Sequence, residues 1–249
     1  MTKPFLSVVI PSWNDAERLP LTLIDIDRHL SAAPFSYEIL VVNDASTDQT
    51  REIVLRLGSA AKNLKLIDNP THRGRGAAVK LGMLAAKGNW RLVFDPSNAI
   101  SIVEFNKILP SVTPNRGIHI LAASRRSHQT TFEGGEPIGR LAMEWVTNRA
   151  AKVILGTKAN DFLLGFHCFS EEAAERIFSS TRTEAMGHSI EAIALGERFG
   201  YSVQEVPVSV SFRSGVGGPL FADYLQMLFE TIRIRWWMSR GKYPDAAKI

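Results

Sequence analysis

The stretch Asn89-Trp90-Arg91-Leu92-Val93-Phe94-Asp95-Pro96-Ser97-Asn98 decides the fold of this chain. Its short apolar run gives way at once to Asp95 and Pro96, a pattern that predicts a buried strand ending at Asp95. In an open parallel sheet, ligands bind beyond the carboxyl ends of the strands, where the connecting loops meet. We therefore expect Asp95 to lie at the functional edge of a sheet.

The composition is that of an ordinary soluble globular enzyme, with 45% hydrophobic and 22% charged residues in a chain of 249. A net charge of +4 permits phosphate-bearing partners without requiring them, and no feature predicts nucleic-acid binding. Cys168 is the only cysteine, so no internal disulfide can form and a reducing compartment is expected. No run approaches the roughly 18 apolar residues that span a bilayer, and no signal-peptide core precedes the first strand. We expect a cytoplasmic protein.

Strands and amphipathic helices alternate along the first half of the chain. Strands are predicted at 5–10, 37–42, 64–67 and 92–94, with helices opening near Asn14 and Ser46 and a third helix over 77–86. Asn14 and Ser46 are N-cap candidates because Glu17 and Gln49 follow three residues later. Pro11 is expected to end the first strand, since it has no N–H to donate. This alternation predicts a doubly wound, mostly parallel α/β sheet flanked by helices.

The second half is less regular. It has predicted strands at 118–123 and 201–208, an apolar segment at 162–169, and helices at 140–155, 171–178, 189–199 and 221–240. The stretch 127–137 is polar and contains glycine, as is typical of a mobile loop. No linker or low-complexity stretch divides the chain, so we expect a single domain over residues 1–249.

Several blocks of residues resemble a known family. They are Val8-Val9-Ile10-Pro11 with Asn14, Glu38-Ile39-Leu40-Val41-Val42-Asn43-Asp44-Ala45-Ser46-Thr47-Asp48, Arg73-Gly74-Arg75-Gly76-Ala77-Ala78, Gly165-Phe166, Glu191, Gly200-Tyr201 and Glu205-Val206-Pro207-Val208. Over nearly its whole length the chain resembles family 2 glycosyltransferases of the GT-A fold, and within these most of all the dolichyl- or polyprenyl-phosphate hexose synthases. The resemblance implies a GT-A, nucleotide-diphospho-sugar transferase-like fold. It also implies inverting transfer of a hexose from UDP- or GDP-hexose to an acceptor such as a polyprenyl phosphate.

The resemblance divides the domain by role. It implies a nucleotide-sugar-binding half at 1–115, an acceptor half at 116–220, and an amphipathic helix with a tail at 221–249. Within the acceptor half, the loop 127–137 is a candidate lid over the acceptor. The acidic Glu191 is implied to be catalytic.

The resemblance also names the residues that would bind the nucleotide. They are Pro11, Trp13, Asp15, Asn43, Asp44, Arg73 and Arg75. The aromatic face of Trp13 can cover a base or ribose, although it can also simply pack against its loop. Asp44 matches the position that hydrogen-bonds the base, and it can equally stabilise a helix entry. Asn43 stands where the family usually has an acid, and its amide can still donate and accept.

Basic residues supply candidate phosphate sites. Arg73 and Arg75 flank two glycines just before a helix, where close backbone approach, the helix terminus and the guanidinium groups all favour an anion. Such a turn also occurs on ordinary surfaces. Arg125, Arg126 and Arg140 are candidates for the acceptor phosphate, with a solvated surface as the alternative.

The chain departs from the family at its metal motif. Asp95-Pro96-Ser97 replaces Asp-x-Asp, so one carboxylate becomes a hydroxyl. Asp95 and Ser97 are the candidate ligands of Mg²⁺ or Mn²⁺, which the loss of a charge should weaken. Ser189 likewise replaces a common acid. We favour an active transferase over the alternative, an impaired homologue that binds nucleotide sugars or serves as a scaffold. A nucleotidyltransferase is disfavoured because the loop 11–15 contains no glycine.

The last helix predicts a peripheral membrane contact. Its apolar stripe consists of Phe221, Leu225, Leu228, Phe229 and Ile232, and Arg233, Arg235, Arg240 and Lys242 cluster around Trp236-Trp237. Basic residues beside aromatic ones suit an anionic membrane, such as an inner membrane face. The alternative is that this helix caps the sheet or contacts a second subunit.

Overall fold

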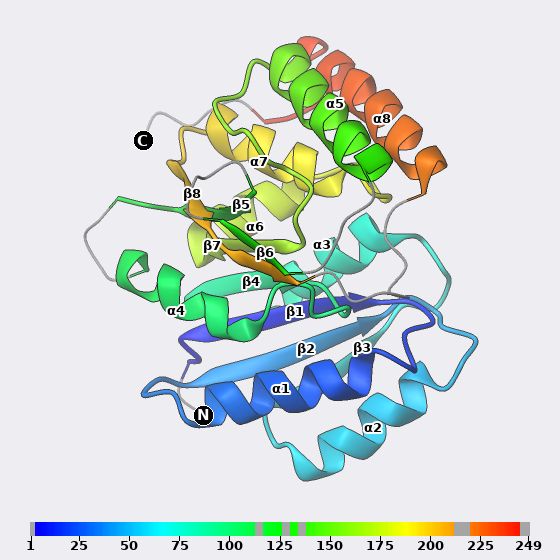
Figure 1. Ribbon diagram of the computed structural model, residues 1–249, viewed down its shortest axis with the longest axis vertical. Coiled ribbons are helices and arrows are strands. Elements are labelled where there is room, and N and C mark those ends of the chain that lie inside the picture. Colours follow the sequence, from blue (N-terminus) through cyan, green and yellow to red (C-terminus); the bar gives the residue numbers. More distant parts are fainter. Residues whose placement is uncertain (1–2, 113–116, 126–129, 134–137, 212–219, 245–249) are drawn as a thin grey trace.

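A seven-stranded sheet forms the centre of the molecule in the computed structural model, which describes residues 3–112, 117–125, 130–133, 138–211 and 220–244 (Figure 1). The strand order is β3-β2-β1-β4-β7-β5-β8. The strands are β1 Leu6–Ser12, β2 Tyr37–Asn43, β3 Leu64–Asp68, β4 Trp90–Phe94, β5 Ile120–Ser124, β7 Phe166–Ser170 and β8 Val203–Pro207. Only β7 among these runs antiparallel to its neighbours, β4 and β5. The predicted mostly parallel α/β sheet is confirmed.

Helices cover both faces of this sheet (Figure 1). On one face lie α1 Leu19–Ser31, α2 Thr50–Ala60 and α4 Phe105–Ile108 with its flanking 3₁₀ turns Ile102–Glu104 and Leu109–Ser111. On the other face lie α3 Arg75–Ala85, α6 Glu171–Ser180 and α7 His188–Arg198. Beyond them α5 Ile138–Leu155 and α8 Phe221–Ser239 pack side by side. A two-stranded ribbon joins β6 Thr131–Glu133 to β9 Ser209–Ser211.

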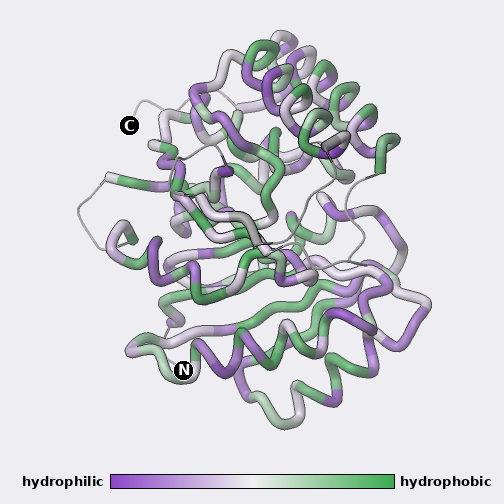
Figure 2. The backbone as a smooth tube through the Cα atoms, in the orientation of Figure 1, coloured by the Kyte–Doolittle hydropathy of each residue, from purple (hydrophilic) through white to green (hydrophobic). Residues whose placement is uncertain are grey.

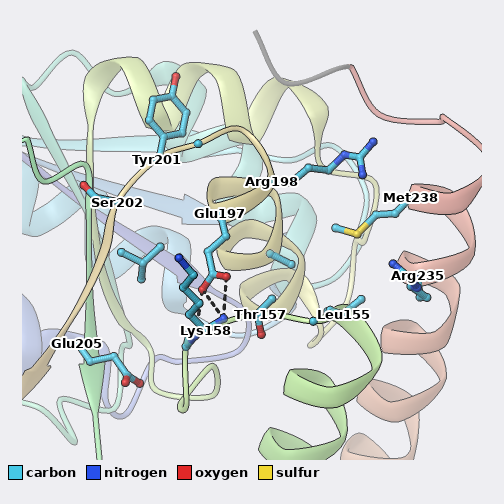
Figure 3. Close-up of a pocket in the computed structure, with 15 residues that line it drawn as sticks. Leu155, Thr157, Lys158, Glu197, Arg198, Tyr201, Ser202, Glu205, Arg235 and Met238 are labelled. Atoms are coloured by element: carbon cyan, nitrogen blue, oxygen red, sulfur yellow. Dashed lines mark hydrogen bonds between the residues drawn. The ribbon is translucent and has the colours of Figure 1, made fainter. Parts of the chain in front are cut away.

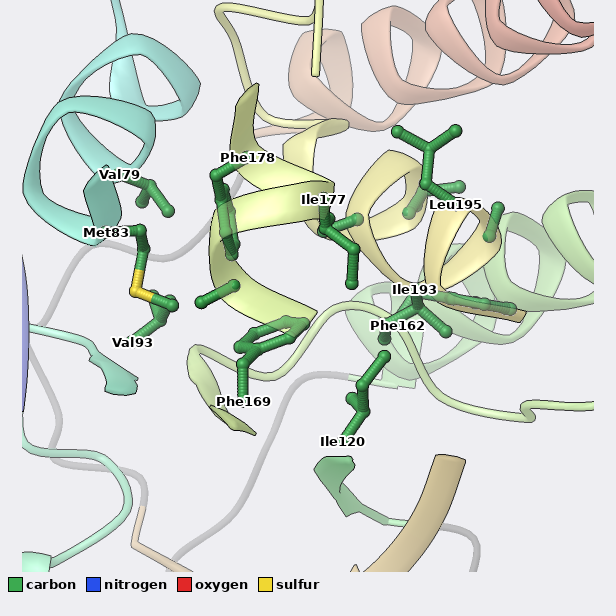
Figure 4. Close-up of a cluster of buried hydrophobic side chains, with 14 of the residues drawn as sticks. Val79, Met83, Val93, Ile120, Phe162, Phe169, Ile177, Phe178, Ile193 and Leu195 are labelled. Atoms are coloured by element: carbon green, nitrogen blue, oxygen red, sulfur yellow. The ribbon is translucent and has the colours of Figure 1, made fainter. Parts of the chain in front are cut away.

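The core divides into two clusters, one on each face of the sheet. Along β1, Val8 and Ile10 belong to one cluster and Val9 to the other, as the two-residue period of a strand requires. Because the central strands are buried on both faces, their sequences are mostly apolar, as the green segments of Figure 2 show. Figure 4 shows the cluster under α6 and α7, where Phe169 and Phe178 meet edge to face at 5.1 Å between ring centroids.

Three local predictions were wrong. Strand β1 continues through Pro11 to Ser12, because β4 pairs with it only as far as Val9 and requires no N–H from Pro11. Helix α1 begins at Leu19, not near Asn14, which adopts a left-handed conformation (φ 53°) and accepts the Thr47 N–H at 2.8 Å. Helix α2 begins at Thr50, four residues after the predicted cap, and the Asp48 carboxylate accepts the Thr50 N–H.

Candidate functional site

The loops after β1, β2 and β4 meet at the carboxyl edge of the sheet. In the β1 loop, the buried Asp15 carboxylate accepts hydrogen bonds from Ser12 Oγ at 3.0 Å and from the Trp13 N–H at 3.1 Å, and it pairs with Arg18. The Asp15 N–H in turn donates to Thr50 Oγ1. Asp15, expected at the nucleotide, therefore holds its own loop in shape, while Trp13 on that loop stays half exposed.

Asp44, after β2, fixes the loop that precedes α3. Its buried carboxylate accepts the Gly74 N–H at 2.7 Å, the Arg73 N–H and the Asn69 side-chain amide at 2.7 Å. Carboxylates that accept several N–H groups order a loop strongly. Asn43 has a similar local task, since its Oδ1 accepts the Ser46 N–H. Both residues thus order the loops at this edge of the sheet.

Trp13 and His72 form an aromatic pair across two of these loops. Their rings stack with centroids 4.4 Å apart and an interplanar angle of 28°, and both residues are about half exposed. His72 Nδ1 lies 2.9 Å from Asp44 Oδ2, which ties the pair to the loop before α3. A stacked, partly exposed pair is a surface on which a base can lie.

Gly74 and Gly76, before and in α3, allow the backbone to pack closely against residues 183–185. The N–H groups of Gly76 and Ala77 donate to the Glu184 carbonyl, at 2.7 and 3.2 Å. A Cβ at Gly76 would lie 2.5 Å from the Thr183 carbonyl oxygen, so only glycine permits this approach. A neighbouring loop therefore occupies two backbone donors of this helix terminus, and the anion site expected here stays a prediction that rests mainly on the arginine side chains. Arg73 pairs with Glu184 on the outside of the same contact.

Arg75 and Asp95 form an ion pair at the centre of the edge. Arg75 Nη2 lies 2.8 Å from Asp95 Oδ2, and the Ser97 N–H donates to Asp95 Oδ1 at 2.8 Å. Gly165 packs against the pair, since a Cβ there would lie 3.0 Å from Asp95 Cβ and 3.1 Å from Arg75 Nη2. Burial alone would raise the pKa of Asp95, but the Arg75 charge and the hydrogen bonds from Ser97 hold that pKa below its usual range.

These residues do not fit a resident divalent cation. Magnesium and manganese favour several oxygen ligands with carboxylates among them, and here Asp95 is already neutralised by Arg75 while Ser97 brings no charge. Within the described ranges, no three His, Cys, Asp or Glu side chains gather in a group that could hold a metal ion. The expected Asp95 and Ser97 metal site is therefore not supported by the donor set.

Two buried histidines behind the edge are neutral. Burial lowers the pKa of His167 to about 4, with the charge of Asp161 acting against that shift and the charge of Arg75 adding to it. Burial and then Arg75 lower the pKa of His188 to about 3. Neither imidazole adds positive charge near neutral pH, so the basic character of this edge comes from its arginines.

Arg125 belongs to a buried ion cluster, not to an open acceptor site. Its Nε and Nη2 each lie 2.9 Å from an oxygen of Asp161, its Nη1 bonds Glu144, and all three side chains are less than 9% exposed. Burial would lower the pKa of Arg125, but the charges of Asp161 and Glu144 raise it well above its usual value. Its buried pairs give Arg125 a structural role, and its predicted contact with the acceptor phosphate stays a prediction.

The other acceptor arginine in the structure borders the same cluster. Arg140 Nε lies 3.5 Å from Glu144 Oε1, and its side chain is about one quarter exposed. It remains a candidate for phosphate contact. Arg126 and most of the loop 127–137 lie outside the described residues.

Glu191 is buried and structural. Its carboxylate accepts the N–H groups of Arg182 and Thr183, at 2.9 and 2.8 Å, and the Tyr243 hydroxyl at 2.5 Å, and the residue is 0% exposed. It thus orders the loop whose Glu184 carbonyl caps α3. This buried position shows a structural role for Glu191, and the expected direct part in catalysis stays a prediction.

A pocket of about 690 Å³ lies elsewhere (Figure 3). It is lined by the end of α5 and the residues before β8, which places it at the amino end of β8, opposite the Asp95 edge. The Glu197 carboxylate in this pocket accepts hydrogen bonds from the backbone N–H groups of Lys158 and Ala159 (dashed lines in Figure 3). None of the predicted site residues lines it.

With this geometry in place, comparison with known proteins decides the family. The sequence pattern that defines the family described as "Glycosyl transferase family 2" matches residues 7–178. The chain belongs to glycosyl transferase family 2. This confirms the resemblance drawn from the sequence and the transferase class that it implied. The matched span contains the Trp13, Asp44, Arg75 and Asp95 loops.

The chain is similar in sequence to proteins named dolichyl-phosphate beta-glucosyltransferase. A dolichyl-phosphate beta-glucosyltransferase of Dictyostelium discoideum is 28% identical, over 93% of this chain and 74% of the relative. The protein of the same name from Saccharomyces cerevisiae is 27% identical, over 98% of this chain and 78% of the relative.

Solved structures show the same fold for this glycosyl transferase. Glucosyl-3-phosphoglycerate synthase from Mycobacterium tuberculosis, in complex with UDP, superposes with a TM-score of 0.67 at 19% identity, covering 98% of this chain and 82% of that one. The same enzyme with Mn²⁺, UDP and glucosyl-3-phosphoglycerate gives a TM-score of 0.66. At this identity the likeness confirms the GT-A fold of the transferase.

Sequence reasoning missed several residues of this glycosyl transferase's site. His72 directly precedes Arg73, but no local sequence pattern predicts that its ring stacks on Trp13. Glu184 lies more than 100 residues from the helix that it caps. Such long-range backbone contacts leave no signal in a single sequence.

Proposed function

We propose that the chain transfers a hexose from a nucleotide-diphosphate sugar to a polyprenyl phosphate, with inversion at the anomeric carbon. The observation that carries this proposal is the edge beyond β1, β2 and β4, which carries both the exposed Trp13 and His72 stack and the Arg75–Asp95 ion pair. The named relatives, dolichyl-phosphate beta-glucosyltransferases, support the acceptor class and make UDP-glucose the first donor to test.

The donor lies with its base on the Trp13 and His72 rings and its diphosphate toward Arg75. An anionic phosphate oxygen of the acceptor lipid attacks the anomeric carbon from the face opposite the diphosphate. The bond from that carbon to the diphosphate breaks, and the electron pair leaves with the nucleoside diphosphate. Such an acceptor is already ionised near neutral pH and needs no general base. The buried position of Glu191 agrees with this.

The acceptor requires contact with a lipid surface, and the outer face of α5 and α8 suits one. Along these two helices, Trp145, Phe229, Ile232 and Trp236 are all at least half exposed. None of the helices in the described part of the chain has the length and apolarity needed to cross a membrane. We therefore place this face on the membrane surface, where exposed apolar side chains enter the headgroup region.

The charges on α8 favour an anionic surface. Arg233, Arg235 and Arg240 are exposed near the carboxyl end of the helix. Glu230 is buried, where it accepts the Gly187 N–H at 2.7 Å; its other oxygen lies 3.5 Å from Arg233 Nη2, so it offsets part of the charge of that arginine. The protein should float with anionic vesicles at low salt, and Phe229→Asp should reduce the bound fraction by about tenfold. Equal flotation of wild type and variant, or none with either, would remove the membrane contact from the proposal.

The activity is tested with radiolabelled UDP-glucose and GDP-hexose, each incubated with polyprenyl phosphate in detergent. Label in the organic phase that depends on the lipid phosphate supports transfer. Donor binding without lipid-linked product, across several chain lengths, favours the alternative of an impaired homologue that only binds nucleotide sugars. Heat-inactivated protein is the control for background label. Asp15→Asn is unsuitable for this purpose because it disturbs the β1 loop.

A further inference from the structure

Arg75 is the cation best placed to meet a diphosphate at the edge of the sheet. Its guanidinium is about one fifth exposed beside Asp95. The N–H groups of Gly76 and Ala77 in the first turn of α3 are engaged by the Glu184 carbonyl. Arg73 is turned toward the side chain of Glu184, and Arg18 toward Asp15. A planar guanidinium matches phosphate oxygens with paired N–H donors, so among the described side chains at this edge we assign the directed contact to Arg75.

A divalent cation would meet an unfavourable field at the same place. Both oxygens of Asp95 have partners, Arg75 Nη2 and the Ser97 N–H, each at 2.8 Å. One carboxylate and one guanidinium are already neutral together, so the pair itself offers a dication no net negative charge, and the Arg75 cation would repel it. The Ser97 hydroxyl cannot offset this repulsion, because it is uncharged.

We propose that this chain binds the diphosphate of its donor through the Arg75 guanidinium and without a divalent cation. Asp95 is the partner that Arg75 keeps while no donor is bound, and the backbone at Gly165 leaves the room that the pair needs. Ser97 is the residue that makes the site unsuited to a divalent cation. A carboxylate at position 97 would supply a second acidic ligand for the metal. This inference rests on the proposed function, because it takes a nucleotide-sugar donor as given.

The test is calorimetric titration of UDP, GDP, UDP-glucose and GDP-glucose into the full chain, once with EDTA and once with Mn²⁺. The proteins are wild type, Arg75→Gln, Ser97→Asp and Arg28→Gln. Arg28 is the matched control, because it is an exposed arginine paired with one aspartate, Asp25, on the α1 helix. Titration of Mn²⁺ into each nucleotide alone removes the heat of the metal complex in solution.

For wild type, we expect the Kd for UDP-glucose or its GDP counterpart in EDTA to lie within about threefold of the value in Mn²⁺. Arg75→Gln should weaken binding by about 10- to 100-fold in both buffers, the loss expected for one charge-assisted hydrogen-bonding group. Arg28→Gln should bind as wild type does. Ser97→Asp should bind about tenfold more tightly in Mn²⁺ than in EDTA.

Two results would overturn the cation-free site while leaving the donor class intact. One is wild-type binding that strengthens tenfold or more with Mn²⁺. The other is unchanged affinity in a folded Arg75→Gln protein. The wild-type comparison stands even where Arg75→Gln fails to fold. Absence of binding by all four nucleotides in both buffers is a different failure, since it removes the proposed function itself.

Discussion

Replacement of Arg125 by methionine should cost stability before it affects substrate binding. The change leaves the carboxylates of Asp161 and Glu144 buried without their main cation, at positions 0% and 7% exposed. Removing one partner of a buried ion pair typically costs about 3–5 kcal/mol. In a chain of this size, each kcal/mol lowers Tm by roughly 2–4 °C, so we expect a fall of about 6–20 °C.

Differential scanning calorimetry measures this fall, with Arg28→Met as the matched control. The Arg28 pair with Asp25 is exposed and should contribute no more than about 1 kcal/mol. In a double-mutant cycle, Asp161→Asn should recover part of the loss, because it removes the unpaired charge. A Tm within about 2 °C of wild type, together with lost transfer activity, would refute this reasoning and return Arg125 to the acceptor site.

Three further outcomes follow from the contacts described. Glu191→Gln should lower the free energy of unfolding by about 1–3 kcal/mol in chemical denaturation, because the buried N–H groups of Arg182 and Thr183 lose a carboxylate acceptor. The Kd for the nucleotide sugar should not change. A weakened Kd at full stability would show a role at the substrate. Gly165→Ala should weaken donor binding about 3- to 10-fold in calorimetry with little change in Tm, since the added Cβ displaces Arg75 by tenths of an ångström; unchanged affinity would contradict this. The depressed pKa values of His167 and His188, about 4 and 3, mean that the unfolded chain takes up protons first as pH falls. Stability should therefore decline below about pH 6.5 by roughly 1 kcal/mol per pH unit for each histidine, and denaturation curves at pH 7 and 5 that coincide would disprove it.

The sheet was largely predictable because its strands are buried on both faces. The runs before Asn43 and Asp95 are continuous and apolar, so their positions and their polar ends follow from the sequence. Helix starts were less predictable. Asn14 has the right residue type and spacing for an N-cap, but its side chain accepts a hydrogen bond from Thr47 in another loop. A capping pattern does not reveal such a competing partner.

The sequence predicted where the site lies, at the carboxyl edge of the sheet. It did not predict which of its residues contact substrate and which stabilise the fold. Arg75 and Asp95 pair at the end of β4 with Gly165 against them, and Trp13 stacks on His72 in the neighbouring loops. Whether a charged residue contacts substrate or stabilises the fold depends on its partners. The partners of Arg125 lie 19 and 36 residues away, and no local spacing announces them. The nucleotide and metal roles of these residues stay predictions until the titrations are made.

The antiparallel strand β7 gives this chain a vulnerable interval during its own synthesis. Strand β4 pairs with β1 on one side and with β7 on the other, and β7 follows it by about 70 residues. Ribosomes add roughly 5–20 residues per second, so the hydrophobic edge of β4 waits about 4–14 s for its partner. An unpaired edge of that kind is where chains join one another. Slow translation through residues 95–165 should therefore reduce the soluble yield, even though the finished protein is unchanged.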